Sequence, residues 1–511
     1  MRVVSRFPRQ AWSRRGGDSA LPLSAVVAAV VLSGIVFLLL WAAAIVVLKY
    51  GSQLRGDLFL ILALVSLVGT LAAFLGVLRS REQAFPLCEV GSVCAIVTTL
   101  YFAVPILNFI AGGMKFTFLS DSRLFVANPT SLEVAAVSWR SVVYLMSFGV
   151  AYLVVRGGAS AASVRIRNPG AEKTVVLVLT LLALGVLVAS IEMLYGVSFD
   201  PSYENLRAGV GLVTQLPYEM QQVMHNVRGM FFLAKQGVLF LLLLHWKRPV
   251  LRYFAIAWLL LEVVSTVVRQ GARTEAVLLL LTAALLYHRV VRPLAFVRVC
   301  VGGAILLVGI VLFGFVRDIQ GGLSGGLAAD VSVLAMMNEF QSLFATTFDL
   351  WQRRNALGEL PWTLYMSEIL MLIPGQLLPF RKIDPSLWYL EQLGLQDSQV
   401  GFMFGVLSQA ILGVDWLELM VRGTVLGCVL GLIHRWYVKR SQRFEVTLLY
   451  VFLCVWSYYT VRAATFYFVY PVVYRFLPFL FIVWFGEAIL RGALRNHEAG
   501  GGYSTHPALH S

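Results

Sequence analysis

The chain has 511 residues, of which 59% are apolar and only 13% are charged, and its mean hydropathy is +0.78. This composition excludes an ordinary soluble globular protein and indicates a protein with many membrane-spanning helices. The net charge of +14 is spread over short loops rather than gathered in a basic soluble domain, so it does not indicate nucleic-acid binding.

Apolar stretches long enough to cross a bilayer recur along the chain, each of about 17 to 25 residues. We therefore expect an all-α polytopic membrane protein with about 12 transmembrane helices. The first apolar run, at 25–48, is longer than the core of a cleaved signal peptide and is expected to be an uncleaved signal anchor. The expected spans centre near Val36, Leu67, Tyr101, Leu145, Leu184, Leu239, Leu259, Leu281, Leu307, Cys428, Phe452 and Phe479.

The distribution of basic residues predicts the orientation. If the N-terminus is cytoplasmic, the short cytoplasmic loops hold more Lys and Arg than those on the other side, so both termini are expected in the cytoplasm of a bacterium. The expected order is a basic cytoplasmic N-terminus at 1–21, spans 1 to 9 at 22–316, a large periplasmic loop with amphipathic helices at 317–414, spans 10 to 12 at 415–490 and a cytoplasmic tail at 491–511.

Motifs for cofactors are missing from the sequence. All five cysteines lie in apolar stretches without a C-x-x-C, and the histidines show no ligand spacing. There is no Asp-x-Asp, Walker A or Gly-x-Gly-x-x-Gly motif, so we expect no metal and no nucleotide cofactor.

The start of the tenth span has two local patterns. Glu418 and Arg422 are four residues apart, which favours an ion pair within one helix. Gly423, Gly427 and Gly431 form a ridge of small residues, which favours close packing against another helix.

The large loop is expected to contain an amphipathic helix at 334–353. Its polar residues share one face and its aromatic residues the other, as at a membrane surface. Two interpretations stay open, a lid with no chemical role or a polar face that lines a site. The polar face holds Glu339, Ser342, Thr346, Asp349 and Arg353, and the aromatic face holds Phe340, Phe344, Phe348 and Trp351.

Arginines recur at the expected external ends of spans. Arg269 and Arg273 lie at the tip of a membrane hairpin, where permanent charge is costly unless it faces a polar cavity or a ligand. Arg317, Arg381 and Arg462 lie on the same side, and the guanidinium group fits phosphate oxygens well. These arginines indicate a diphosphate site, with contact to lipid headgroups as the alternative for any one of them.

A transfer reaction that removes a proton at such a site would use a carboxylate or imidazole as the base. Asp349 and Glu339 are the first candidates because one helix face holds both, and Asp318, Glu275 and His225 are further candidates. Glu89, Arg140 and Glu262 are ionisable groups inside apolar stretches, where proton coupling and structural pairing are equally open.

At these residues the sequence resembles the Wzy-type oligosaccharide repeat unit polymerases, which include the O-antigen polymerases. The resemblance covers roughly 255–435, and Gln409 stands where that family often has an acidic residue. Its motifs are Gly271-Ala272-Arg273, Tyr287-His288, the span that ends in Arg317, Pro374, Leu378-Pro379-Phe380-Arg381-Lys382-Ile383, Gly401, Ser408 and Gly413.

The resemblance implies a glycosyltransferase of GT-C-like architecture in the bacterial inner membrane. It would polymerise polyprenyl-diphosphate-linked oligosaccharide repeat units into O-antigen, capsule or exopolysaccharide at the periplasmic face. Its partners would be the lipid-linked oligosaccharide and membrane lipids, and a chain-length regulator is a further candidate partner. The alternatives are an O-antigen ligase-type transferase, a flippase or exporter of lipid-linked oligosaccharide, and a passive assembly partner.

Overall fold

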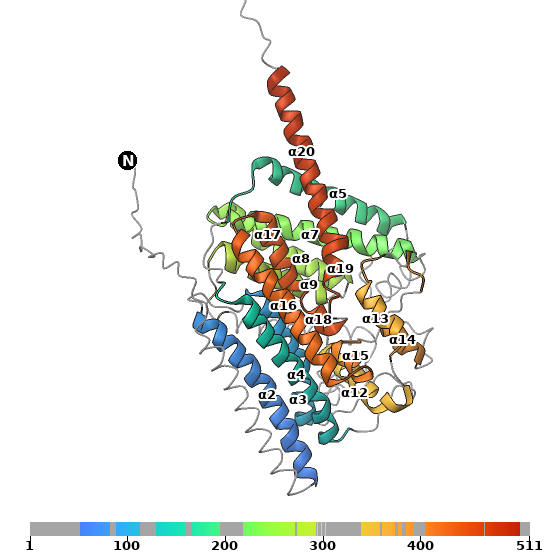
Figure 1. The fold of residues 1–511 in the computed structure, drawn as a ribbon. Helices are drawn as coiled ribbons and strands as arrows, with labels where there is room; N and C mark the ends of the chain where they lie inside the picture. The colour runs from blue at the N-terminus through green and yellow to red at the C-terminus, as the bar shows by residue number, and fades with distance from the viewer. Residues whose placement is uncertain are drawn as a thin grey trace, which may run out of the picture.

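The computed structural model describes residues 52–81, 88–112, 129–159, 166–194, 218–270, 273–292, 294, 298, 302, 339–357, 360–373, 377–380, 385–392, 404–463 and 465–500. All regular elements within these ranges are helices (Figure 1). In chain order they are α2 (Ser52–Arg81), α3 (Val90–Gly112), α4 (Ser131–Arg156), α5 (Ala171–Leu194), α7 (Tyr218–Leu244), α8 (Pro249–Gln270), α9 (Arg273–Val290), α12 (Glu339–Leu357), α13 (Trp362–Ile369), α14 (Pro385–Gln392), α15 (Val406–Leu412), α16 (Trp416–Arg440), α17 (Phe444–Trp456), α18 (Tyr459–Arg462), α19 (Val469–Pro471), the π-helix η4 (Val472–Phe476) and α20 (Leu477–Gly500).

Within the described ranges, 8 helices are long and apolar enough to cross a membrane. They coincide with the expected spans centred near Leu67, Tyr101, Leu145, Leu184, Leu239, Cys428, Phe452 and Phe479, which confirms an all-α polytopic membrane protein. The expected spans near Leu259 and Leu281 correspond to α8 and α9, and their crossing of the membrane stays a prediction. Those near Val36 and Leu307 lie outside the described residues.

The centre of the bundle is the close pairing of α4 with α16. An added Cβ at Gly423 would lie 2.6 Å from the Tyr144 carbonyl oxygen, and one at Gly427 would lie 2.4 Å from the Phe148 carbonyl oxygen. At Gly431 the nearest atom is the Val155 Cβ, at 3.0 Å. Contact positions advance together along both helices, so the two run in the same direction. The expected role of the glycine ridge in close packing is confirmed.

The bundle has two distinct ends. The end at which α4 and α16 begin is called the loop end here, because α12 to α15 gather beside it on one side of the bundle (Figure 1). The opposite end, where both helices finish, is called the far end.

The loop helix α12 lies within the protein. Phe344 and Phe348 are buried in an apolar cluster with Ile106 of α3 and Val134 of α4. The polar face is also buried, at Thr346 and Asp349 among others. The expected helix at 334–353 is found at Glu339–Leu357, but the interpretation of its aromatic face as a membrane surface is wrong. Amphipathic spacing requires an apolar neighbour for that face, and the ends of α3 and α4 provide it instead of lipid.

Candidate functional site

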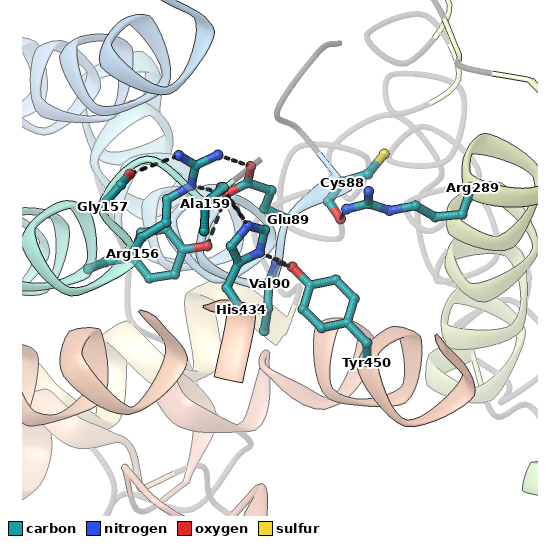
Figure 2. A network of polar contacts seen from close by, with 10 residues as sticks. Cys88, Glu89, Val90, Arg156, Gly157, Ala159, Arg289, His434 and Tyr450 are labelled. Carbon is teal, nitrogen blue, oxygen red and sulfur yellow. Dashed lines mark hydrogen bonds and ion pairs between the residues drawn. The ribbon is translucent and has the colours of Figure 1, made fainter. Parts of the chain in front are cut away.

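The far end holds a buried polar network around Glu89, which directly precedes α3 (Figure 2). Its carboxylate accepts hydrogen bonds from Arg156 Nε at 2.9 Å and Nη2 at 2.6 Å. It also accepts one from the Tyr152 hydroxyl at 3.0 Å. The side chains of Glu89 and Arg156 are only 2% and 0% exposed, so their charges compensate each other away from water.

His434 continues this network toward α17. Its Nε2 lies 3.3 Å from the Ala159 carbonyl, which can only accept, so Nε2 carries the proton. In the neutral imidazole, Nδ1 then accepts from the Tyr450 hydroxyl at 2.7 Å, and that hydroxyl accepts from the Val90 N–H at 3.0 Å. Figure 2 shows this chain of contacts passing from Arg156 to Tyr450. Because its donors and acceptors match one another, the network ties α3, α4, α16 and α17 together.

The other ionisable groups singled out inside apolar stretches also have partners of opposite charge. Arg140 makes a bidentate ion pair with Asp415, at 2.6 Å for each bond. Glu262 of α8 pairs with Lys235 of α7. Paired ions of this kind are explained by helix packing without a catalytic role.

A second polar cluster lies at the loop end. Arg422 of α16 bonds to Glu418 at 2.7 Å, as the four-residue spacing predicted. Its Nη1 also donates to both carboxylate oxygens of Glu368 in α13 at 2.8 Å and to the Thr465 hydroxyl at 3.0 Å. Tyr365 of α13 donates to Glu418 at 3.1 Å. The cluster therefore fastens α13 to the first turns of α16.

Arg475 lies deeper at this end and has no carboxylate beside it in the described part of the chain. It belongs to the π-helix η4, and its residue is only 4% exposed. Its guanidinium stacks over the Trp456 ring at 4.9 Å, and its Nε has no hydrogen-bond partner among the described residues. An added Cβ on Gly229 of α7 would lie 2.3 Å from the Arg475 Cδ, so the α7 backbone packs against its stem.

The local sequence favours the wide turn that holds Arg475. Pro478 has no N–H to give to the carbonyl four residues earlier, which disturbs the regular helical hydrogen bonds. Single π-turns inside α-helices occur often at functional sites. A buried guanidinium without a counter-charge is expensive, at several kcal/mol, and an anionic ligand would compensate it.

Aromatic rings link Arg475 with Arg462, one of the arginines expected at a diphosphate. Arg462 is half-buried, with its guanidinium 5.9 Å from the ring centroids of both Tyr458 and Tyr459. Consecutive ring pairs, with centroids 4.2 to 6.4 Å apart, run from α17 to η4. We call this set the aromatic ladder, which consists of Trp456, Tyr458, Tyr459, Tyr467, Tyr470 and Tyr474.

Asp349, the first candidate base, is buried in α12 and outside the candidate spans. It accepts a hydrogen bond from the Tyr389 hydroxyl at 2.5 Å and lies 2.9 Å from Arg353 Nε. Burial raises the pKa of the Asp349 carboxyl, and the contacts with Tyr389 and Arg353 oppose that rise. Gly405 lies between α12 and α18 and is in close contact with both. An added Cβ there would lie 2.7 Å from the Leu343 side chain and 2.3 Å from the Val461 carbonyl oxygen.

The remaining expected site residues are not placed relative to one another. Glu339 begins α12, Arg269 lies in the last turn of α8 and Arg273 begins α9, but the described structure does not include their side chains. The same holds for Glu275 and His225. Arg317, Asp318 and Arg381 lie outside the described residues.

Arg475 was not among the residues singled out from the sequence. One signal was present, because Arg475 is the only charged residue in the apolar stretch from Val469 to Val483. The pattern of arginines at span ends does not include Arg475, because it lies inside the span Val469–Arg495. Glu368 was missed for another reason, since its partner Arg422 is distant in sequence and only the fold brings them together.

Comparison with known proteins identifies no similar protein. No protein-family model, no curated protein and no solved structure matches this chain.

Proposed function

We propose that the protein is a polytopic glycosyltransferase that polymerises polyprenyl-diphosphate-linked oligosaccharide repeat units at the periplasmic face of the bacterial inner membrane. The loop end is then the periplasmic end. The reaction transfers the growing glycan from its lipid diphosphate to a hydroxyl of an incoming repeat unit. The leaving group is a diphosphate, on which negative charge builds as the glycosidic carbon–oxygen bond breaks.

The observation that carries this proposal is Arg475. A guanidinium that is buried with no carboxylate beside it among the described residues is electrostatically incomplete there, and a diphosphate would complete it. Arg462 reaches the same aromatic ladder from α18, so two cations flank one set of rings. Aromatic rings with hydroxyl groups also suit sugars, because they offer an apolar face for the ring carbons and hydrogen bonds for the hydroxyls.

Asp349 is the candidate base of this reaction. Its raised pKa makes it a stronger proton acceptor than an exposed carboxylate, although Tyr389 and Arg353 occupy it in this structure. Asp349→Asn should therefore lower polymerisation. If it does not, and Glu339→Gln does not either, α12 has no part in the chemistry.

The test of the proposal is chain growth by purified protein in nanodiscs supplied with a defined polyprenyl-diphosphate repeat unit. Arg475→Met keeps the volume and removes the charge, and we expect it to abolish the polymer ladder. Arg475→Lys should restore it poorly, because a point charge cannot replace the bidentate fork. Losing a charged hydrogen bond to a buried partner costs about 2 to 5 kcal/mol, which is at least about 30-fold in affinity.

Arg491→Met is the matched control in the same candidate span, because Arg491 is 54% exposed and paired with Glu487. It should leave the ladder unchanged. If the parent protein makes no polymer from these repeat units, glycosyl transfer is refuted, and movement of the lipid across vesicles would instead favour a flippase. Normal polymer from Arg475→Met would remove Arg475 from the site.

A further inference from the structure

In the segment 361–373, which contains α13, polar side chains face the protein and large apolar side chains face outward. Its polar side chains Ser367 and Glu368 are buried against the protein. On its outer side Trp362 is 64% exposed and Ile369 is 67% exposed. A loop helix that faced water would have the opposite arrangement. We call residues 361–373 the α13 segment.

The side chains that are exposed on the α13 segment are all apolar. Glu368 is the only charged residue in the segment, and it is bonded to Arg422 inside the protein. Soluble surfaces rarely expose a contiguous apolar patch of this kind, since exposed apolar area costs about 25 cal/mol for each Å² left in water. Large apolar residues exposed on the segment and just after it are Trp362, Ile369, Leu372, Ile373 and Leu377.

The position of the α13 segment along the axis of the helix bundle follows from its hydrogen bonds to α16. Glu368 and Tyr365 bond to Arg422 and Glu418, which lie in the first turns of the candidate span Trp416–Arg440. The segment is therefore level with the beginning of that span and does not stand above it. Its neighbours on α16 expose apolar residues as well, at Leu417, Met420 and Val421.

We propose that the α13 segment is a membrane-contact element whose exposed face lies in the lipid leaflet at the loop end. Lipid is the occupant that fits, because the face is level with a span, and α16, to which the segment is bonded, exposes apolar residues at the same level. A tryptophan at the edge of such a face is typical of the membrane interface. A protein partner would leave a polar rim around an apolar centre, and the segment has no exposed charge to form one.

The segment also joins this lipid contact to the candidate site. The Tyr474 hydroxyl donates to the Leu372 carbonyl at 2.6 Å, and Tyr474 is the last ring of the aromatic ladder, one residue before Arg475. If the proposed function holds, the lipid carrier would reach the arginines sideways from that leaflet, past the α13 segment. The membrane contact itself does not depend on that function.

The test measures the surroundings of a fluorescent label at Ile369→Cys in proteoliposomes of phosphatidylcholine and phosphatidylglycerol. Nitroxide on the lipid acyl chains quenches labels in lipid, and iodide quenches labels in water. The label at Ile369 should be quenched by the lipid nitroxide about as strongly as one at Leu417→Cys, which is on the outer face of a span. Iodide should leave it unchanged.

Asn355→Cys is the matched control on the loop side, because Asn355 is an exposed polar residue near the end of α12. Iodide should quench it, and the lipid nitroxide should not. The unmodified chain measures the background from native cysteines, of which Cys88, Cys94 and Cys454 are buried. Quenching of the Ile369 label by iodide would overturn the proposal, and so would protection from both quenchers, which would show a covering protein such as a second copy. No outcome depends on enzymatic activity.

Discussion

Glu89→Gln provides a direct test of the far-end network. The change keeps the shape of the side chain and removes its charge. Arg156, whose side chain is fully buried, then loses the carboxylate that accepts two of its hydrogen bonds. Removing one partner of a buried ion pair costs about 3 to 5 kcal/mol, because the other charge stays buried without compensation.

A more exposed ion pair in the same protein provides the comparison for this loss of stability. Glu172 lies 3.9 Å from Arg491, and their side chains are 35% and 54% exposed. Solvent screens such a pair, so Glu172→Gln should cost about 1 kcal/mol or less. The two variants change the same chemical group, but Glu89 is buried and directly hydrogen-bonded to Arg156, whereas Glu172 is partly exposed and only lies near Arg491.

The assay is thermal unfolding of the detergent-solubilised protein, followed by the loss of the folded peak in size-exclusion chromatography. Glu89→Gln should lower the midpoint on the order of 5 to 10 °C, and Glu172→Gln by no more than about 2 °C. Adding Arg156→Met to Glu89→Gln should recover part of the loss, because no unpaired charge remains. Equal midpoints for Glu89→Gln and Glu172→Gln would refute the reasoning.

Two further predictions concern packing and pH. Gly427→Ala places a Cβ 2.4 Å from the Phe148 carbonyl oxygen and should destabilise the protein by about 1 to 3 kcal/mol, whereas Gly69→Ala, with open space around it, should be neutral or slightly stabilising. A neutral effect at Gly427 would contradict the close pairing. Burial raises the pKa of the Asp349 carboxyl above its ordinary value, so the stability that the protonated carboxyl contributes is lost as pH rises from that value through the folded pKa. The unfolding midpoint of Asp349→Asn should therefore rise relative to that of the parent as pH increases above 3.8, and a difference that does not change with pH would contradict this.

Local patterns in the sequence predicted the parts of the structure that depend on nearby residues. Apolar length predicted the spans, and four-residue spacing predicted both the glycine ridge and the pair of Glu418 with Arg422. Partners distant in sequence could not be predicted, such as Glu368 for Arg422 or Arg156 for Glu89. Nothing in the spacing of charged residues along a chain records which of them the fold brings together.

The two loop helices show the same limit for amphipathic faces. The aromatic face of α12 suggested a membrane surface, yet Phe344 and Phe348 pack on α3 and α4. The short helix α13 drew no such interpretation, and it is the one that exposes Trp362 and Ile369. Periodicity shows that a helix has an apolar face, and only the positions of its polar contacts show whether that face meets protein or lipid.

Because Arg475 has no carboxylate partner in the described part of the chain, a stability measurement can separate a functional role from a structural one. A structural arginine holds its neighbours together, so its loss lowers stability and activity together. Arg475 has a stacking contact with Trp456, worth about 0.5 to 2 kcal/mol, against a burial penalty of several kcal/mol that no carboxylate within the described ranges offsets. Arg475→Met should therefore unfold at the same temperature as the ligand-free parent or higher.

Ligand should reverse that order. A diphosphate that binds only the folded parent raises its unfolding midpoint by mass action, by about 2.7 kcal/mol at a hundred times its Kd. Geranylgeranyl diphosphate should stabilise the parent and the control Arg491→Met, and leave Arg475→Met unchanged. Such a residue lowers the stability of the ligand-free protein and raises its affinity for the ligand. This is typical of sites that bind charge in a low-dielectric interior. A lower midpoint for ligand-free Arg475→Met would show instead that Arg475 serves the packing of α7 against η4.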